Sequence, residues 1–489
     1  MVHLSYLTKL RRLHWPTLCL ALVAAFALPA GAQSAAPAAA TATATQPANR
    51  PFIHDLERRT FNFFWQTANP RNGLVADRYP YPPFASIAAV GYGLTAYPIG
   101  VERGYVTRAQ AVKRVLLTLK FLRDAPQGEA ETGFAGYKGF YYHFIDMETG
   151  VRHRHIELST VDTTLLLGGV LFCEGYFNRK TPAETELRRL AEELYRRVDW
   201  TWASRSGGAV VMGWSPEHGF ERDDWRGYNE AMLTYVLGLG SPTHPLADGA
   251  WKKWTDGYEG KWKTEYGQTY LTFPPLFGHQ FSHIWIDFRG IADDYMRGHG
   301  IDYFENSRRA TYAQQAYAVE NPMHWKAYGA RLFGISAGDG PVDATLPWGG
   351  ETRRFYRYAA HGIGGAANYD DGTLSPSALV SSIVFAPEIV LPAIEETQKR
   401  YGTHIYLQYG YVDTFNPSFD FDVPLGTGRR IPGVGWVASD YLGIDQGSII
   451  GMLGNYEGEL VWRVMRKNAA VRRGLKRAGF RGGWLDAPP

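Results

Sequence analysis

The chain has 489 residues, of which 20% are charged and 14% aromatic, and its formal net charge is +3. Acidic and basic residues are interspersed, so the sequence lacks the basic patch of a nucleic-acid-binding protein. Of the two cysteines, Cys19 lies in the apolar N-terminal run described next, which leaves Cys173 alone and excludes an internal disulfide in a processed chain.

The first 32 residues have the layout of a secretory signal peptide. Basic residues precede an apolar run from Leu18 to Leu28, and the small residues Ala30-Gly31-Ala32 follow it. Residues 33–50 are almost wholly Ala, Thr, Gln and Pro, a composition that buries too little apolar surface to order a chain. No later run approaches the roughly 20 apolar residues of a membrane helix. We therefore expect a signal peptide (1–32), a disordered tether (33–50) and one domain (51–489) in a periplasmic or secreted monomer without stable membrane insertion.

Helical patterns recur along the rest of the chain. Thr181-Pro182-Ala183-Glu184 reads as a capping box with proline at the first helical position, and Thr107 is a plausible cap. In the first half the predicted helices are 52–66, 86–103, 107–122, 159–177, 181–202 and 228–239. In the second half they are 280–297, 303–319, 324–331, 375–385, 386–399 and 446–465.

About twelve helices in antiparallel pairs fit an all-α fold, the (α/α)6 toroid of six inner and six outer helices. Segments 87–91 and 165–170 are apolar on nearly all sides and contain small residues, as expected for helices of an inner ring. Long loops usually carry function. Here they are rich in Gly, Trp and Asp, and we expect them to form a cleft at one end of the barrel. They comprise residues 123–157, 204–227, 242–278, 335–373 and 404–445.

Carboxylates and aromatic residues in this arrangement suggest glycoside hydrolysis, which commonly uses two carboxyl groups. The 15 Trp, 30 Tyr and 25 Phe supply faces that can pack against sugar rings, although most aromatic residues are expected in the core. Glu230 is predicted in the first turn of a helix that is otherwise apolar. Desolvation there favours the protonated form of a general acid, whereas the helix N-terminus opposes it. The alternative is an ordinary first-turn acid that completes a cap.

Three aspartates are candidates for the second carboxyl group. Asp162 stands near a helix start, before an apolar run. Asp445 precedes a helix predicted to begin at Gln446, and Asp413 lies in a long loop. For Asp162 and Asp445 the alternative is a helix-capping role.

The segment from Phe277 to Arg289 is dense in hydrogen-bonding side chains. His279 and His283 are four residues apart and share a helix face, and Asp287 could join them around a metal ion. However, no Glu follows the first His as in zinc proteases, and no Cys joins in, so we expect no metal ion here. Sugar binding is the preferred interpretation, with core histidines as the competitor. The predicted substrate-binding residues are Trp225, Tyr228, His279, Gln280, His283, Trp285, Asp287 and Arg289.

Other enzyme classes lack their motifs. The glycines at 362–365 do not join a strand to a helix, which argues against a dinucleotide or phosphate loop. No Gly-x-Ser-x-Gly elbow precedes a helix, so a serine hydrolase has no candidate nucleophile.

Several ordered motifs resemble the glucoamylase-like domain family of glycoside hydrolases, whose characterised members include bacterial endo-β-1,2-glucanases. The resemblance runs from about Phe52 to about Arg466. It is carried by residues 228–232, 240–244, 277–290, 303–309 and 442–447, which include Tyr228-Asn229-Glu230-Ala231-Met232, Phe277-Gly278-His279-Gln280 and Leu442-Gly443-Ile444-Asp445-Gln446-Gly447.

The resemblance implies an (α/α)6 barrel, no cofactor, and hydrolysis of β-1,2-glucan to sophoro-oligosaccharides, generally with inversion. It maps the acid onto Glu230. The base stays open among Asp445, Asp413 and Asp162, because related enzymes are thought to activate water through a relay. The segment 417–439 is longer than the family pattern, which predicts altered subsites. The alternatives are another glucosidase, either exo-acting or glucoamylase-like, and a non-catalytic periplasmic glycan-binding protein.

Overall fold

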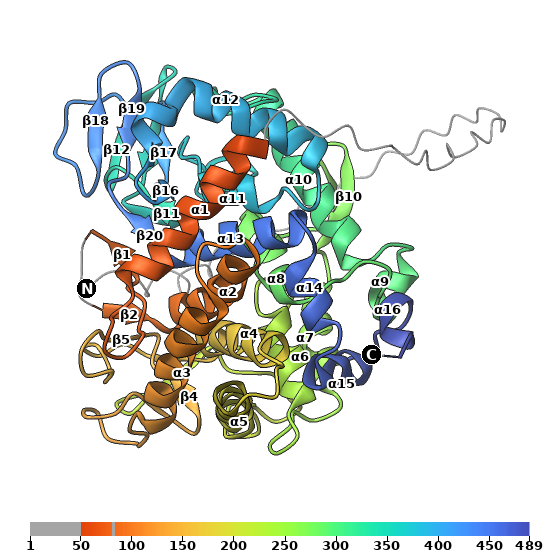
Figure 1. Ribbon diagram of the computed structural model, residues 1–489. Helices are drawn as coiled ribbons and strands as arrows, with labels where there is room; N and C mark the ends of the chain where they lie inside the picture. The colour runs from red at the N-terminus through yellow and green to blue at the C-terminus, as the bar shows by residue number, and fades with distance from the viewer. Residues whose placement is uncertain (1–49, 81–83, 489) are drawn as a thin grey trace, which may run out of the picture.

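The computed structural model describes residues 50–80 and 84–488, and helices predominate in it (Figure 1). The predicted signal peptide and all of the tether except Arg50 lie outside the described residues. Arg50 begins the first helix, α1 (Arg50–Thr67). Within the described part of the chain, no helix is both long and apolar enough to cross a membrane.

A central set of helices is buried on nearly every side. Among them, α2 packs against α4 and α13, α4 against α6, and α13 against α11. The contact between α2 and α4 depends on glycine, because a Cβ added to Gly169 would lie 2.0 Å from the carbonyl oxygen of Gly91. This close approach explains the small residues that the sequence places in both helices. The central helices are α2 (Ile87–Glu102), α4 (Thr160–Tyr176), α6 (Met232–Gly240), α8 (Phe281–Trp285), α11 (Pro376–Ser381) and α13 (Gly443–Tyr456).

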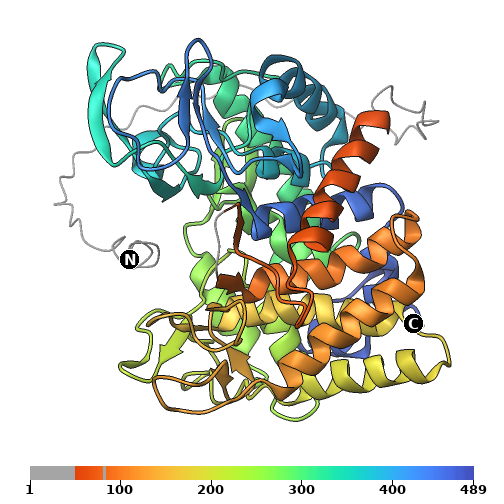
Figure 2. The same ribbon diagram turned by 60° about the vertical axis from the view of Figure 1, so that its left-hand side comes forward.

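The remaining helices lie around this set (Figures 1 and 2). Thr107 caps α3 in a complete capping box with Gln110. Thr181 caps α5, but the side chain of Glu184 binds Arg108 instead of completing the predicted box. The helices are α3 (Arg108–Asp124), α5 (Pro182–Arg196), α7 (Ala250–Thr255), α9 (Asp294–Gly298), α10 (Tyr303–Glu320), α12 (Pro387–Ile405), α14 (Leu460–Met465), α15 (Ala469–Arg477) and α16 (Gly483–Asp486).

Several predicted helices in the second half differ from the observed ones. The segment 280–297 holds two short helices, α8 and α9, with turns between them. The segment 324–331 forms turns, and His324 and Ala327 adopt positive φ angles that no α-helix allows. The predicted helix 446–465 is split into α13 and α14 at Glu459, which also has a positive φ. A positive φ angle at a single residue can therefore end a helix even where the apolar periodicity of the sequence continues beyond it.

Short antiparallel strands accompany the helices, so the fold is helix-rich and not purely helical. Strands lead directly into α2, α4 and α13, and the strand before α13 pairs with a strand near the N-terminus, Arg78 opposite Leu442. The pairs are β1 (Arg78–Tyr79) with β20 (Tyr441–Leu442), β2 (Phe84–Ser86) with β5 (Phe144–Asp146), β3 (Gly136–Tyr137) with β4 (Phe140–Tyr141), and β9 (Trp262–Glu265) with β10 (Gln268–Leu271).

Most strands of the C-terminal half gather in one part of the molecule, at the upper left of Figure 1. They come from the long loops that the sequence predicts at 335–373 and 404–445. The sheets here are β11 (Ala337–Asp339) with β14 (Tyr358–Ala360), β12 (Ala344–Trp348) with β13 (Glu351–Phe355), β15 (Tyr406–Leu407) with β16 (Gly410–Tyr411), and β17 (Phe415–Asn416) with β19 (Gly435–Val437) and β18 (Arg429–Ile431). In the N-terminal half, β6 (Leu158–Ser159), β7 (Gly213–Ser215) and β8 (Gly219–Phe220) form one further sheet.

Candidate active site

Two of the predicted aspartates occupy the same position in two central helices. Asp162 is the third residue of α4, and Asp445 is the third residue of α13. Free backbone N–H groups at a helix start favour a carboxylate. The alternative helix-capping role does not apply to Asp445, because α13 begins at Gly443 and has no side-chain cap. Its Oδ1 instead accepts a hydrogen bond of 3.0 Å from the hydroxyl of Ser377.

Glu230 precedes α6 and does not lie in its first turn, as the sequence predicted, because the helix begins at Met232. Ser282 of α8 fixes this segment: its hydroxyl donates to the carbonyl oxygen of Glu230 at 2.8 Å and accepts from the backbone N–H of Leu233 at 3.0 Å. Burial, with a smaller contribution from the charge of Asp162, raises the pKa of Glu230 to about 7 against an opposing backbone hydrogen bond. Near neutral pH this carboxyl is therefore available as a proton donor.

The phenol group of Tyr92 in α2 interacts electrostatically with three of the candidate carboxylates. Burial raises the pKa of Tyr92 well above its usual value, and the charges of Asp162, Asp445 and Glu230 add to this shift. Its hydroxyl is buried and has no hydrogen-bond partner among the described residues. The phenol group is thus an uncommitted hydrogen-bonding group near three carboxylates.

The position of Tyr92 is set by packing. Its ring lies 5.3 Å from that of Trp285, nearly parallel to it, and meets Phe281 edge-on at 6.1 Å. Gly447 of α13 provides the room, since a Cβ there would lie 2.0 Å from Cγ of Tyr92. Sequence reasoning missed Tyr92; the signal was a tyrosine directly after the apolar segment 87–91, which contains small residues.

Asp413 and Asp445 form a buried carboxyl pair. Burial and the charge of Asp445 raise the pKa of Asp413 well above its usual value. Burial also raises the pKa of Asp445 to about 7, against hydrogen bonds from Asp413 and Ser377. Asp413 is fixed by the backbone N–H of Asp339, which donates to its Oδ2 at 2.8 Å. Two such carboxyls cannot both ionise easily, so the pair retains a proton near neutral pH, held by Asp413.

Arg78 compensates part of the negative charge beside this pair. Its Nη1 donates to Asp339 at 3.0 Å and to Asp440 at 3.1 Å, and its Nε donates to Asp77 at 3.4 Å. Burial alone would lower the pKa of Arg78, but Asp339 and Asp77 raise it, so the cation is permanent. The sequence did not single out Arg78, because its partners are up to 362 residues away.

Asp162 is held by two side chains. The hydroxyl of Ser159 donates to its Oδ2 at 2.5 Å, and Nε2 of His143 lies 3.6 Å from the same oxygen. The other ring nitrogen of His143 lies 2.8 Å from Glu157. Burial alone would lower the pKa of His143, but Asp162 and Glu157 raise it to about 9. A histidinium thus sits beside Asp162, and sequence reasoning missed it as well.

Most of the predicted substrate-binding residues are bonded inside the fold. The indole of Trp225 donates to Thr160 at 2.9 Å, and that of Trp285 donates to Thr95 at 3.1 Å. The amide of Gln280 donates to the carbonyl of Ala378 and the hydroxyl of Ser382. The Tyr228 hydroxyl lies 3.4 Å from that of Ser307. All four are buried, which argues against direct sugar contacts.

The histidines of the same prediction are also internal. His279 and His283 are each 1% exposed. Nε2 of His279 lies 3.2 Å from the carbonyl of Phe273, and Nε2 of His283 lies 3.0 Å from the Ser307 hydroxyl. Burial lowers the pKa of His279 to about 3 and that of His283 well below its usual value, so both are neutral. This arrangement favours the alternative of core histidines.

Asp287 and Arg289 belong to an ion-pair network away from the carboxylates. Arg289 binds Asp287 through two nitrogens, at 2.8 and 3.0 Å, and Glu459 at 2.8 Å. Arg466 also pairs with Asp287 and with Glu459. Their role in the fold is to join the segment after α8 to α14. Among the residues that the structure describes, no group of three or more His, Cys, Asp or Glu side chains is placed to hold a metal ion.

A large cavity lies at the other end of the central helices. Its volume is about 990 Å³, and it is lined by Glu174 near the C-terminus of α4, by Arg473 of α15 and by other charged residues. None of the four candidate carboxylates lines it. The cavity is therefore separate from the candidate active site.

Comparison with known proteins identifies the family. Residues 222–469, just over half of the chain, match the family model "Glycoamylase", described as "Putative glucoamylase". The chain belongs to this glucoamylase-like family. The match includes Glu230, Asp413 and Asp445, whereas Asp162 precedes it.

Relatives of this glucoamylase-like chain act on β-1,2-linked glucans. A curated relative from Parabacteroides distasonis, an exo β-1,2-glucooligosaccharide sophorohydrolase acting at the non-reducing end, is 24% identical over 454 residues and covers 86% of this chain. The chain spans 57% of the length of that relative.

Two solved structures match over nearly the whole chain. An endo-β-1,2-glucanase from Chitinophaga pinensis, in complex with sophorotriose and glucose, is 26% identical with a TM-score of 0.75, covering 90% of this chain and 100% of that one. A "putative glucoamylase" from Bacteroides uniformis is 28% identical with a TM-score of 0.76, covering 91% and 100%.

Proposed function

We propose that this protein is a glycoside hydrolase that cleaves β-1,2-glucan. The observation that carries the proposal is the Glu230 carboxyl, whose pKa is raised to about 7 and which shares the surroundings of Tyr92 with a second ionisable carboxyl, Asp445. An acid and a base near the same point are what glycoside hydrolysis requires. The substrate is supported by the C. pinensis and P. distasonis relatives.

In the proposed mechanism Glu230 is the general acid and protonates the leaving glycosidic oxygen. Asp445 is the base that accepts a proton from the attacking water, directly or through a relay of hydroxyl groups, with inversion at the anomeric carbon. Asp413 keeps its own proton and donates it in a hydrogen bond to Asp445, which favours the ionised form of the base. Asp162 acts on Glu230 through its charge.

The direct test is hydrolysis of linear β-1,2-glucan by the purified protein, followed by reducing ends. We expect sophoro-oligosaccharide products, and a loss of about a thousandfold or more in kcat for Glu230→Gln, because general acid catalysis and the proton it delivers are removed. Activity on starch or cellulose in place of β-1,2-glucan would assign another glucosidase. Binding of glucan without cleavage by the unaltered protein would assign a glycan-binding protein.

We propose endo cleavage, following the C. pinensis enzyme, while the P. distasonis relative supports exo cleavage as the second candidate. The time course of chain length distinguishes them. Endo cleavage shortens long chains early and yields a mixture of oligosaccharides. Exo cleavage releases one short product from the start while the remaining chains stay long.

The proposal also covers the fold, export and oligomeric state of the protein. We propose that the central helices and their neighbours complete an (α/α)6 toroid in one domain, supported by the packing of α13 against both α2 and α11. We further propose that the protein is a monomer exported through the signal peptide at residues 1–32 to the periplasm or medium. N-terminal sequencing of the exported protein tests the cleavage site, and light scattering tests the monomer.

A further inference from the structure

We infer that a pocket between the β12–β13 hairpin and the segment 418–421 is a second carbohydrate-binding site, with Trp348 as the platform for a pyranose ring. The pocket has a volume of about 350 Å³ and contains none of the candidate catalytic carboxylates. The hairpin belongs to the strand-rich part of the molecule, at the upper left of Figure 2. The lining of the pocket is Lys326, Pro347, Trp348, Gly349, Gly350, Ser418, Asp420 and Phe421.

The aromatic floor of the pocket is rigid. The indole of Trp348 lies 5.2 Å from that of Trp325, inclined by 32°, and its Nε1 donates to the carbonyl of Met323 at 3.3 Å. Phe421 packs on Phe355 at 5.5 Å. Both lining rings are only partly buried, so part of each ring is exposed to solvent. A fixed aromatic face binds an apolar ring face at little cost in conformational entropy.

The polar groups around this floor suit sugar hydroxyls. Ser418 is 1% exposed and accepts a hydrogen bond from the backbone N–H of Lys326 at 2.8 Å, which fixes the two walls of the pocket to each other. The ammonium group of Lys326 lies 5.9 Å from the Trp348 ring, and the carboxylate of Asp420 is 43% exposed. A donor, an acceptor and an aromatic face within one small pocket match the two kinds of surface that a pyranose presents.

The rim of the pocket is open. Gly349 and Gly350 form the two-residue turn between β12 and β13, with φ angles of 61° and 86°. No heavy atom outside the turn lies within 4 Å of a Cβ added to either glycine. A ligand can therefore approach the pocket over this turn, where it would meet the Lys326 side chain beside the Trp348 ring. The opposite wall comes from Ser418, Asp420 and Phe421, in the segment that follows β17.

The site takes a glucose unit of a long glucan chain, and it rests on the proposed function for the choice of β-1,2-glucan as the probe. The test uses the full chain in the Glu230→Gln background, which prevents turnover. Affinity for long β-1,2-glucan is measured by retardation in gels that contain the polysaccharide, with laminarin, cellulose oligosaccharides and starch in parallel. Hydrolysis of β-1,2-glucan by the unaltered protein is measured alongside.

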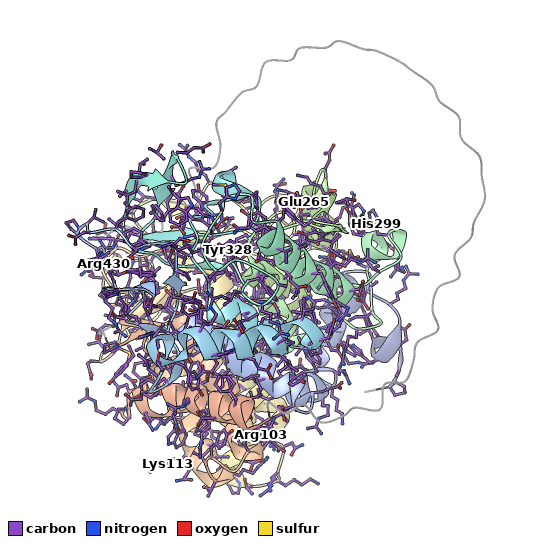
Figure 3. All side chains as sticks on the ribbon, turned by 90° about the horizontal axis from the view of Figure 1, so that it is seen from above. Arg103, Lys113, Glu265, His299, Tyr328 and Arg430 are labelled. Atoms are coloured by element: carbon purple, nitrogen blue, oxygen red, sulfur yellow. The ribbon has the colours of Figure 1, made fainter. Side chains whose placement is uncertain are left out.

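We expect Trp348→Ala to weaken binding of the long glucan about tenfold, the order of magnitude for one lost aromatic contact. Phe421→Ala and Asp420→Asn should weaken binding of the long glucan several-fold. If an aromatic variant is destabilised, Asp420→Asn still tests the site. Trp262→Ala is the matched control, because Trp262 stacks on His299 at 3.8 Å, and Figure 3 shows His299 far from Arg430, the ion-pair partner of Asp420.

Unchanged affinity in folded Trp348→Ala and Asp420→Asn variants overturns the inference, and so does the absence of binding to every glucan. Hydrolysis of β-1,2-glucan with unchanged affinity in these variants supports the proposed function while overturning the second site. Conversely, a protein that binds another glucan through Trp348 and does not cleave β-1,2-glucan supports the second site and refutes the proposed function. Crystals soaked with sophorotriose must show a sugar ring on Trp348, and an empty pocket there contradicts the inference.

Discussion

Nε2 of His143 lies 3.6 Å from Oδ2 of Asp162, and the raised pKa of His143 makes its ring a histidinium. This cation therefore pairs with the carboxylate whose charge raises the pKa of Glu230. The pKa of His143 is raised to about 9, so this ring is a cation over the pH range in which Glu230 titrates. This relationship separates two roles among the carboxylates: Glu230 exchanges a proton, and Asp162 adds to the effect of burial on the pKa of Glu230.

The first prediction concerns Asp162→Asn. Removing this charge lowers the pKa of Glu230, so the alkaline limb of the pH profile of kcat/KM moves to lower pH. Activity at pH 8 should fall by about three- to tenfold, with a smaller change at pH 6. Glu157→Gln is the control, since Glu157 also contacts His143 but does not raise the pKa of Glu230. An alkaline limb that stays in place in Asp162→Asn would refute this role.

A second prediction distinguishes two replacements of Asp413. Asp413→Asn keeps a hydrogen-bond donor toward Asp445, so we expect an acidic limb close to that of the unaltered protein. Asp413→Ala removes the hydrogen bond that lowers the pKa of Asp445, so the acidic limb should move to higher pH. The pH profile of kcat/KM measures both. If the acidic limbs of the two variants were identical, the limb would not report the ionisation of Asp445, and Asp445 would not be the base.

Glu230→Gln should stabilise the protein at alkaline pH. The pKa of Glu230 is about 7 in the folded chain and lower in the unfolded chain, so the native state loses stability as pH rises through this interval. Glutamine cannot ionise and avoids the loss. Because the side chain is not fully buried, we expect a gain of only about 1–2 kcal/mol in the free energy of unfolding at pH 8, and almost none at pH 4. Urea denaturation at the two pH values checks this, and an equal gain at both would contradict it.

Gly447→Ala should destabilise the contact between α13 and α2. Its Cβ would lie 2.0 Å from Cγ of Tyr92, so either the ring or the helices must move, at a cost of about 1–3 kcal/mol. Gly458→Ala is the matched control, since no atom lies within 4 Å of its added Cβ and its φ is not positive. Thermal unfolding of both variants measures the difference, and equal melting temperatures would disprove the packing argument.

Tyr92→Phe should separate activity from stability. The variant keeps the ring packed on Trp285 and removes a buried hydroxyl that has no partner in the described structure. We therefore expect an unchanged or slightly higher melting temperature. If the hydroxyl binds the substrate or water among the carboxylates, kcat falls about tenfold, the value of one hydrogen bond. Unchanged kcat would restrict Tyr92 to a packing role.

Local pattern was sufficient for several parts of the molecule. The apolar helices with small residues at 87–91 and 165–170 form the central helices α2 and α4, and Thr107 caps α3 as predicted. Helix interiors were predictable because periodicity and caps are properties of neighbouring residues. Breaks such as Glu459 were not, since a positive φ at a non-glycine residue is stabilised by tertiary contacts.

The candidate site also combines features that local sequence predicts with features that depend on tertiary contacts. The sequence by itself placed Glu230, Asp162 and Asp445 near helix starts, because short-range pattern and motif encode that placement, but it did not fix on which side of the helix start Glu230 and Asp445 lie. Only the tertiary structure decided which carboxyl holds a proton. Desolvation and through-space charge depend on groups such as Tyr92, His143 and Arg78, which packing brings to the site from distant parts of the chain.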